Sequence, residues 1–184
     1  MAIDPSKLRI QLFPAEVLRQ KATPVEPGPE MEAVGERMLE LMRGAEGIGL
    51  AGPQVGLSWR VFVCDVPPTE DEPASDGPPS ASSGPGVFLN PTIVEHAGPL
   101  EPYDEGCLSL PGITGQVHRP AIATMEALTP KGEAVRLTAT GLLARCWQHE
   151  IDHLDGLLIL DKMSQASRLK NRARVRAMEK AGRR

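Results

Sequence analysis

The sequence predicts an α+β fold in which antiparallel strands wrap around a central helix. Two strand-like runs, at about 116–128 and 134–139, are joined by a Pro-Lys-Gly turn of the kind found in hairpins. Helical sequence follows over about 141–154. A last helix is predicted over about 164–180, at the C-terminus. These elements, all in the second half of the chain, set the expected fold class.

The 184 residues suit one domain spanning 1–184, with a core mainly of Leu, Val, Ile and Ala because aromatic residues make up only 3%. No apolar run reaches membrane-spanning length, so no membrane partner is expected. The first five residues lack the apolar region of a secretory signal, which favours a cytoplasmic location. Three cysteines without a C-x-x-C pair cannot form a disulfide framework.

The net charge of −4 is unevenly distributed. From Arg168 onward, eight basic residues stand against Glu179 alone, a local charge of +7 that leaves −11 on the rest of the chain. This asymmetry is compatible with an anionic partner such as nucleic acid, and equally with a solvated terminal helix.

The N-terminal half contains two predicted helices. The first, over about 13–20, opens at Pro14, a favoured first helical position. The second, over 30–44, has apolar residues at helical spacing and ends at Gly44. The segment 47–56 holds four glycines and a proline, so we expect irregular structure there that allows close backbone approach.

Two further strands and one insertion are expected before the hairpin. A buried strand is predicted over 59–66. The stretch 67–86 is rich in Pro, Ser, Gly and acids and predicts a mobile surface insertion, because it cannot bury enough surface to offset its ordering entropy. The strand over 87–95 is interrupted at Asn90-Pro91, which indicates an edge or a bulge.

The central helix carries the motif His149-Glu150-Ile151-Asp152-His153. Residues i and i+4 stack on one helical face, so two imidazoles so placed can bind one divalent metal. Glu150 can then act on a water without ligating the metal. The alternative is an ordinary amphipathic helix with two His on its polar side. With the metal, the fold becomes antiparallel strands around a central metal-binding helix.

A catalytic site of this type needs a third protein ligand and an open position. In the commonest metalloproteases that ligand lies downstream, but Asp155 is nearly opposite on the helix wheel and Asp161 is weakly placed. Cys107, in a glycine-flanked loop upstream, offers a thiolate.

Three segments together resemble the motifs of the peptide deformylase family, in order. They are Gly47-Ile48-Gly49-Leu50-Ala51-Gly52-Pro53-Gln54, Glu105-Gly106-Cys107-Leu108-Ser109 and Gln148-His149-Glu150-Ile151-Asp152-His153. The resemblance implies an enzyme that removes the N-formyl group from formyl-methionine of newly made polypeptides and releases formate.

The resemblance also implies the roles of the site residues. Cys107, His149 and His153 would bind the metal, typically Fe²⁺, with Zn²⁺, Ni²⁺ or Co²⁺ able to occupy the same site. Glu150 would be the general acid/base. The Gln54 amide and, by resemblance, the Leu108 N–H would stabilise the oxyanion.

The substrate pocket is predicted in part from the helix. Leu142 and Cys146 share one helical face with the two His and give an apolar wall for an unbranched side chain. Arg145 borders this face and is expected to shape the pocket rim with its charge in solvent. By resemblance, Ile48 forms the opposite wall and the backbone around Gly49 pairs with the substrate peptide.

Some neighbouring features and alternatives are open. Glu105 is expected to hold the Cys107 loop through Arg119, unless both are merely surface charges. Gly52 stands where the family usually has Ala. It is expected to preserve the close backbone approach but to loosen the loop that carries Gln54. The alternatives to a deformylase are a peptidase of the general H-E-x-x-H kind and a non-catalytic ribosome-binding protein with a structural metal and a basic tail.

Overall fold

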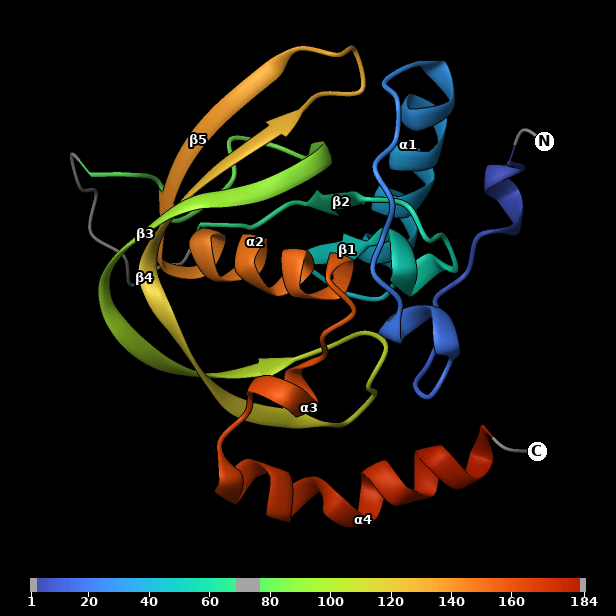
Figure 1. The fold of residues 1–184 in the computed structure, drawn as a ribbon, viewed down its shortest axis with the longest axis vertical. Coiled ribbons are helices and arrows are strands. Elements are labelled where there is room, and N and C mark those ends of the chain that lie inside the picture. The colour runs from blue at the N-terminus through green and yellow to red at the C-terminus, as the bar shows by residue number, and fades with distance from the viewer. Residues whose placement is uncertain (1–2, 69–76, 183–184) are drawn as a thin grey trace.

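The computed structural model describes residues 3–68 and 77–182 (Figure 1). The strands form one antiparallel sheet in the order β1-β2-β3-β4-β5, so each strand pairs with the next one along the chain. The strands are β1 (Gly49–Ala51), β2 (Val61–Cys64), β3 (Gly86–Gly106), β4 (Thr114–Leu128) and β5 (Ala134–Thr140). The α-helices are α1 (Pro29–Gly44), α2 (Gly141–Leu154), α3 (Ile159–Lys162) and α4 (Gln165–Ala181). Short 3₁₀ helices cover Pro5–Lys7, Glu16–Arg19 and Gly52–Val55.

The long strands β3 and β4 curve around α2, while α4 lies outside the sheet (Figure 1). Their pairing shifts register three times, between Leu89 and Thr92, between Ile93 and Glu95, and between Ala97 and Leu100. Such bulges bend a strand and increase its twist. The two strands can therefore enclose the helix without a break in the sheet. Within the described residues, no helix has both the length and the apolarity needed to cross a bilayer.

The strand β2 is buried on both faces and separates two parts of the core. Phe62 and Cys64 pack with residues of α2, whereas Val61 and Val63 pack with residues of α1. Successive side chains in a strand point to opposite faces, which explains why a short apolar run serves both helices. Since β1 pairs with β2, the glycine-rich segment is held directly beside α2.

The start of α2 is capped by the described end of the 67–86 insertion. Thr140 N donates to Pro79 O at 3.0 Å and Leu143 N donates to Ser80 O at 2.9 Å. These carbonyls satisfy backbone donors that a helix N-terminus leaves without partners. The mobile insertion was expected over 67–86, and its residues 69–76 lie outside the described residues.

The predicted α+β class is confirmed, and so are the helices at 30–44, 141–154 and 164–180, to within a residue or so. The predicted helix over 13–20 is wrong, because only Glu16–Arg19 coils, as a 3₁₀ turn. A segment this short gains too few hydrogen bonds to offset helix nucleation. The bulge at Asn90-Pro91 is confirmed.

Two segments contain more β-strand than the sequence predicted. The segment 47–56 is not wholly irregular, since it contains β1 and a 3₁₀ turn. The strand predicted over 87–95 continues to Gly106 as β3, although most of its second half is exposed. Backbone pairing with β4 holds that half, so it carries no alternating apolar pattern that a sequence could reveal.

Candidate metal centre and substrate cavity

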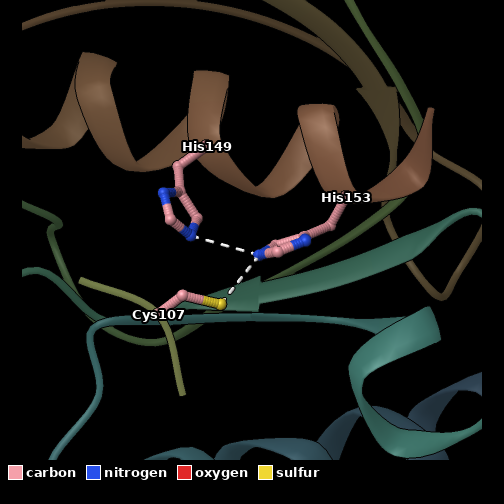
Figure 2. A group of neighbouring side chains, drawn as sticks. All are labelled: Cys107, His149 and His153. Carbon is pink, nitrogen blue, oxygen red and sulfur yellow. Dashed lines mark hydrogen bonds between the residues drawn. The ribbon is translucent and has the colours of Figure 1, made fainter. Parts of the chain in front are cut away.

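The helix α2 presents both imidazoles of its motif on the face turned toward the Cys107 loop (Figure 2). His149 and His153 are one turn apart, and their Nε2 atoms lie 3.2 Å from each other. His153 is buried at 1% exposure, with His149 nearer the cavity. The two nitrogens thus converge on one point, as the i, i+4 spacing predicted.

Cys107 reaches this point from the turn that follows β3. Its Sγ lies 3.3 Å from His153 Nε2, and the turn is closed by the Leu110 N–H, which donates to Cys107 O at 2.9 Å. The ligand atoms of Cys107, His149 and His153 all lie within 4.8 Å of one another (Figure 2).

Two of the three separations among these atoms, His149–His153 and Cys107–His153, fit a tetrahedral metal ion. Metal–nitrogen bonds of about 2.0–2.1 Å and a metal–sulfur bond of about 2.3 Å place two nitrogens about 3.3 Å apart, and nitrogen and sulfur about 3.6 Å apart. The observed separations of 3.2 and 3.3 Å are close to these values. Three protein ligands leave a fourth position open, which is characteristic of catalytic rather than structural sites.

Glu105 orients the first imidazole. Its Oε2 lies 3.0 Å from His149 Nδ1, so the ring donates there and keeps its Nε2 lone pair for a ligand. Arg119 donates to both carboxylate oxygens, at 2.7 and 2.9 Å, and to Asp152 at 2.7 Å. The predicted Glu105–Arg119 ion pair is therefore confirmed, and Asp152 joins it.

The charges around the imidazoles favour a cation between them. Burial alone would raise the pKa of Glu105, but hydrogen bonds from Arg119 and His149 outweigh it and hold that pKa well below its usual range. Burial alone would lower the pKa of His149, yet Cys107 and Glu105 raise it to about 10. Burial lowers the pKa of His153 well below its ordinary value. The positive charge held here is a proton on His149, and a metal ion bound at His149 Nε2 would displace that proton.

Glu150 points into the cavity beside the ligands. It is 4% exposed, and its Oε2 has no hydrogen-bond partner among the described residues. Burial raises its pKa to about 7. A carboxyl group with this pKa can both accept and return a proton near neutral pH.

Gln54 reaches the same point from the 3₁₀ turn after β1. Its Nε2 donates to Cys107 Sγ at 3.4 Å, and its Oε1 accepts from the Ala51 N–H at 2.8 Å. The side chain is 1% exposed and is held by this second bond. The amide donor is therefore aimed at the candidate metal centre. Leu108 lines the cavity beside Cys107.

A cavity of about 510 Å³ opens onto the centre. Its lining includes all five residues that the sequence assigned to substrate binding, namely Ile48, Gly49, Leu142, Arg145 and Cys146. Cys146 is buried, and a hydrogen bond with the Cys64 thiol, together with burial, raises its pKa well above the ordinary value. That fits a wall residue rather than a nucleophile.

The expectation that the Arg145 charge reaches solvent is wrong. Arg145 is only 8% exposed, and its guanidinium donates to Glu105 Oε1 at 2.8 Å and to Glu101 O at 2.8 Å. The buried carboxylate of Glu105 attracts it inward, which a helix-wheel argument does not reveal. Tyr103, whose ring lies 5.2 Å from the Arg145 guanidinium carbon, also lines the cavity and was not identified from the sequence.

Gly52 is tightly enclosed, which agrees with the close backbone approach expected there. A Cβ at this position would lie 2.5 Å from the Trp59 carbonyl oxygen and 3.2 Å from Val61 Cγ1. Gln54, two residues later, is fixed by the hydrogen bond from Ala51. Glycine at residue 52, in place of the alanine expected from the family, therefore leaves room for the Trp59 carbonyl to approach closely.

Comparison with known proteins identifies relatives over most of the chain. Residues 7–169 match the family model for polypeptide deformylase. Peptide deformylase of Desulfitobacterium hafniense is 46% identical over 155 residues, which is 84% of this chain and 93% of the relative. Peptide deformylase of Thermodesulfovibrio yellowstonii is 40% identical over 162 residues, covering 88% and 92% of the two chains.

Solved structures of similar proteins share the fold. Peptide deformylase from Ehrlichia chaffeensis has a TM-score of 0.85 at 32% identity, covering 95% of this chain and 98% of that one. Peptide deformylase from Thermotoga maritima has a TM-score of 0.75 at 38% identity, covering 85% and 97%.

Proposed function

The chain belongs to the polypeptide deformylase family, and we propose that Cys107, His149 and His153 hold its metal ion while Glu150 transfers the protons. The protein is a metal-dependent hydrolase that removes the N-formyl group from the N-terminal formyl-methionine of newly made polypeptides and releases formate. The observation that supports the residue assignment is the convergence of two Nε2 atoms and one Sγ within 4.8 Å.

The reaction adds water to the formyl carbon and breaks its bond to the methionine nitrogen. Cys107, His149 and His153 would hold a divalent ion, which would lower the pKa of water from about 15.7 to roughly 7 and so supply a nucleophile at neutral pH. Glu150 takes the proton of the attacking water and passes it to the departing amine. Its raised pKa, about 7, suits a group that must do both.

The negative charge that develops on the formyl oxygen is stabilised by fixed donors. The Gln54 Nε2, aimed at Cys107, and the Leu108 backbone N–H are the two groups assigned to this role. The Gln54 amide is held by the Ala51 N–H before the substrate arrives, so it needs little reorganisation during the reaction.

The methionine side chain of the substrate occupies the cavity. Leu142 and Cys146 form one wall, Ile48 the opposite wall, and the backbone at Gly49 pairs with the peptide. Arg145 lies at the border of this pocket, and its guanidinium faces the buried Glu105 carboxylate. An unbranched, mostly apolar side chain fits a lining of this character.

We propose Fe²⁺ as the metal, with Zn²⁺, Ni²⁺ or Co²⁺ able to replace it. A thiolate with two imidazoles is a ligand set that all of these ions accept. A ferrous ion beside a thiolate is vulnerable to oxidation. Elemental analysis after anaerobic purification therefore tests the choice, and zinc as the dominant metal in such a preparation would contradict it.

We also propose that α4 contacts ribosomal RNA in the cytoplasm, where formylated chains emerge. Six exposed basic residues of α4 form no ion pair within the described residues. Arg168 and Arg174 donate to backbone carbonyls, which leaves Lys170, Arg172, Arg176 and Lys180 without a side-chain partner there. Asn171 anchors the opposite side of the helix by donating to Thr114 O at 2.8 Å.

The RNA proposal predicts binding that weakens as salt rises. For single-stranded RNA, log K should fall by roughly 0.7 for each phosphate contact when the salt concentration rises tenfold. Replacing the four basic residues by Ala should abolish it without lowering activity on a short peptide. RNA binding unchanged by that replacement would contradict the contact.

The experiment that tests the catalytic assignment is formate release from formyl-Met-Ala-Ser by anaerobically purified protein. Release is expected from the wild type and not from Glu150→Gln. The general peptidase alternative predicts cleavage of unformylated peptides instead, and family membership excludes a purely structural, non-catalytic role for the chain.

A further inference from the structure

The buried guanidinium of Arg145 lies between the substrate cavity and Glu105. Its Nη1 donates to Glu105 Oε1 at 2.8 Å and to Val117 O at 3.2 Å, and its Nη2 donates to Glu101 O at 2.8 Å. The group therefore joins β3, β4 and the Glu105 carboxylate to α2. Three acceptors in different directions are well matched to a planar guanidinium and cannot all be reached by a lysine ammonium.

The Glu105 carboxylate needs two arginines to fill its acceptor positions. Oε1 accepts from Arg119 Nε at 2.7 Å and from Arg145 Nη1, while Oε2 accepts from Arg119 Nη2 at 2.9 Å and faces His149 Nδ1 at 3.0 Å. Arg119 is also bound to Asp152, so it is shared. Contacts on both oxygens fix the plane of the carboxylate, and that plane directs Oε2 at the imidazole.

The other side of Arg145 borders the cavity. Its guanidinium carbon lies 5.2 Å from the centre of the Tyr103 ring, and both residues line the cavity together with Leu142. A substrate side chain seated there lies against the same group that holds Glu105. No other arginine lines this cavity among the described residues.

We propose that Arg145 is a positioning residue that orients His149 through Glu105, and so links the side-chain pocket to the geometry of the metal ligands. The proposal rests on the metal-ligand set proposed above. Loss of Arg145 leaves Glu105 with Arg119 alone, which frees the carboxylate to tilt and lets the His149 ring turn with it. Outer partners of metal ligands affect metal affinity in this way.

The test compares Arg145→Met with Arg136→Met in cobalt-loaded protein. Met keeps most of the stem volume and removes the donors. Arg136 is a matched control, because it is also an arginine paired with a glutamate, Glu126. It lies on β5 with its side chain exposed, and it does not line the cavity. The readouts are the rate of Co²⁺ release to a chelator, well below the unfolding temperature, and the visible absorption bands of the bound cobalt.

Arg145→Met is expected to release Co²⁺ several-fold faster than the wild type. Mutating a direct partner of a metal ligand typically lowers metal affinity by roughly 10–100-fold, and Arg145 acts one step further out, so its effect should be no larger than the low end of that range. Its cobalt bands should shift, and Arg136→Met should match the wild type on both counts. In a Glu105→Gln background, Arg145→Met should have a much smaller effect, because the two act as one unit. If Glu105→Gln does not fold, the proposal is tested by the Co²⁺ release rate and the absorption bands of the single variant Arg145→Met, each compared with the wild type.

The proposal is overturned if Arg145→Met releases cobalt at the wild-type rate with unchanged bands, even when KM rises, since Arg145 would then only shape the pocket. A full additional effect of Arg145→Met in the Glu105→Gln background would also overturn it. Failure of the ligand set itself has a different signature, namely metal retained after Cys107→Ala.

Discussion

The Glu150 carboxylate occupies the space in which any residue other than glycine at position 49 would place its Cβ. A Cβ on Gly49 would lie 2.4 Å from Glu150 Oε1 and 2.8 Å from Cys146 Sγ. Both distances are too short for atoms that are not bonded. Glu150 and Cys146 are each only 4% exposed, and both line the cavity, so a Cβ at position 49 would have to displace the carboxylate within that cavity. The close pairing of β1 with α2 therefore depends on the missing side chain.

Gly49→Ala should lower kcat/KM by roughly 10²-fold or more, because the displaced carboxylate loses part of a general acid–base contribution of about 10²–10⁴. Metal content should stay at the wild-type level, since the ligands lie outside the clash. Gly44→Ala is the control, because a Cβ there meets nothing within 4 Å. Formate release by Gly49→Ala at the wild-type rate would show that Glu150 is not constrained as described.

Glu150→Gln should lower kcat by roughly 10²–10⁴, because the amide cannot accept the water proton. The substitution is nearly isosteric, so the metal and the fold should be retained. Elemental analysis and formate release on the same preparation measure both. A variant that is inactive because it has lost its metal would assign Glu150 to binding rather than to proton transfer.

Gln54 makes two hydrogen bonds that two substitutions can separate. Gln54→Glu keeps the acceptor for the Ala51 N–H but removes the donor aimed at Cys107, whereas Gln54→Ala removes both. Each should lower kcat by roughly 10²–10³, the usual loss for an oxyanion donor. Wild-type kcat in Gln54→Glu alone would mean that Gln54 acts only by bracing the turn.

Gly52→Ala should lower the free energy of unfolding by about 1–3 kcal/mol, as overpacking of a close-packed site commonly does. The added Cβ would meet the Trp59 carbonyl oxygen, a backbone atom that cannot rotate away. Denaturant unfolding measures the loss, again with Gly44→Ala as control. An unchanged midpoint would mean that the segment after β1 has room for the alanine common in the family.

Much of this site could be predicted because its residues stand in short, local patterns. The i, i+4 spacing of His149 and His153 places both side chains on one helical face. The predicted bounds of that helix, 141–154, agree with those of α2. Cys107 could be linked to that face only through the resemblance of three motifs. A single sequence contains no signal for the long-range approach of a loop to a helix.

The contacts that the sequence did not reveal are those that depend on buried charge. Arg145 borders the pocket on a helix wheel, but whether its guanidinium faces water or Glu105 depends on where β3 passes. The second half of β3 was itself missed, because its exposed residues lack a period that marks a strand. The position of Tyr103 follows from that same half-strand.

The metal content of Cys107→Ala tests the central claim most directly. Cys64→Ala is the matched control, because Cys64 is also a free cysteine and is buried in the core next to α2. We expect about one metal ion per chain in the wild type and in Cys64→Ala, and none in Cys107→Ala, as three-ligand catalytic sites require each ligand. A full complement of metal in folded Cys107→Ala would contradict the account.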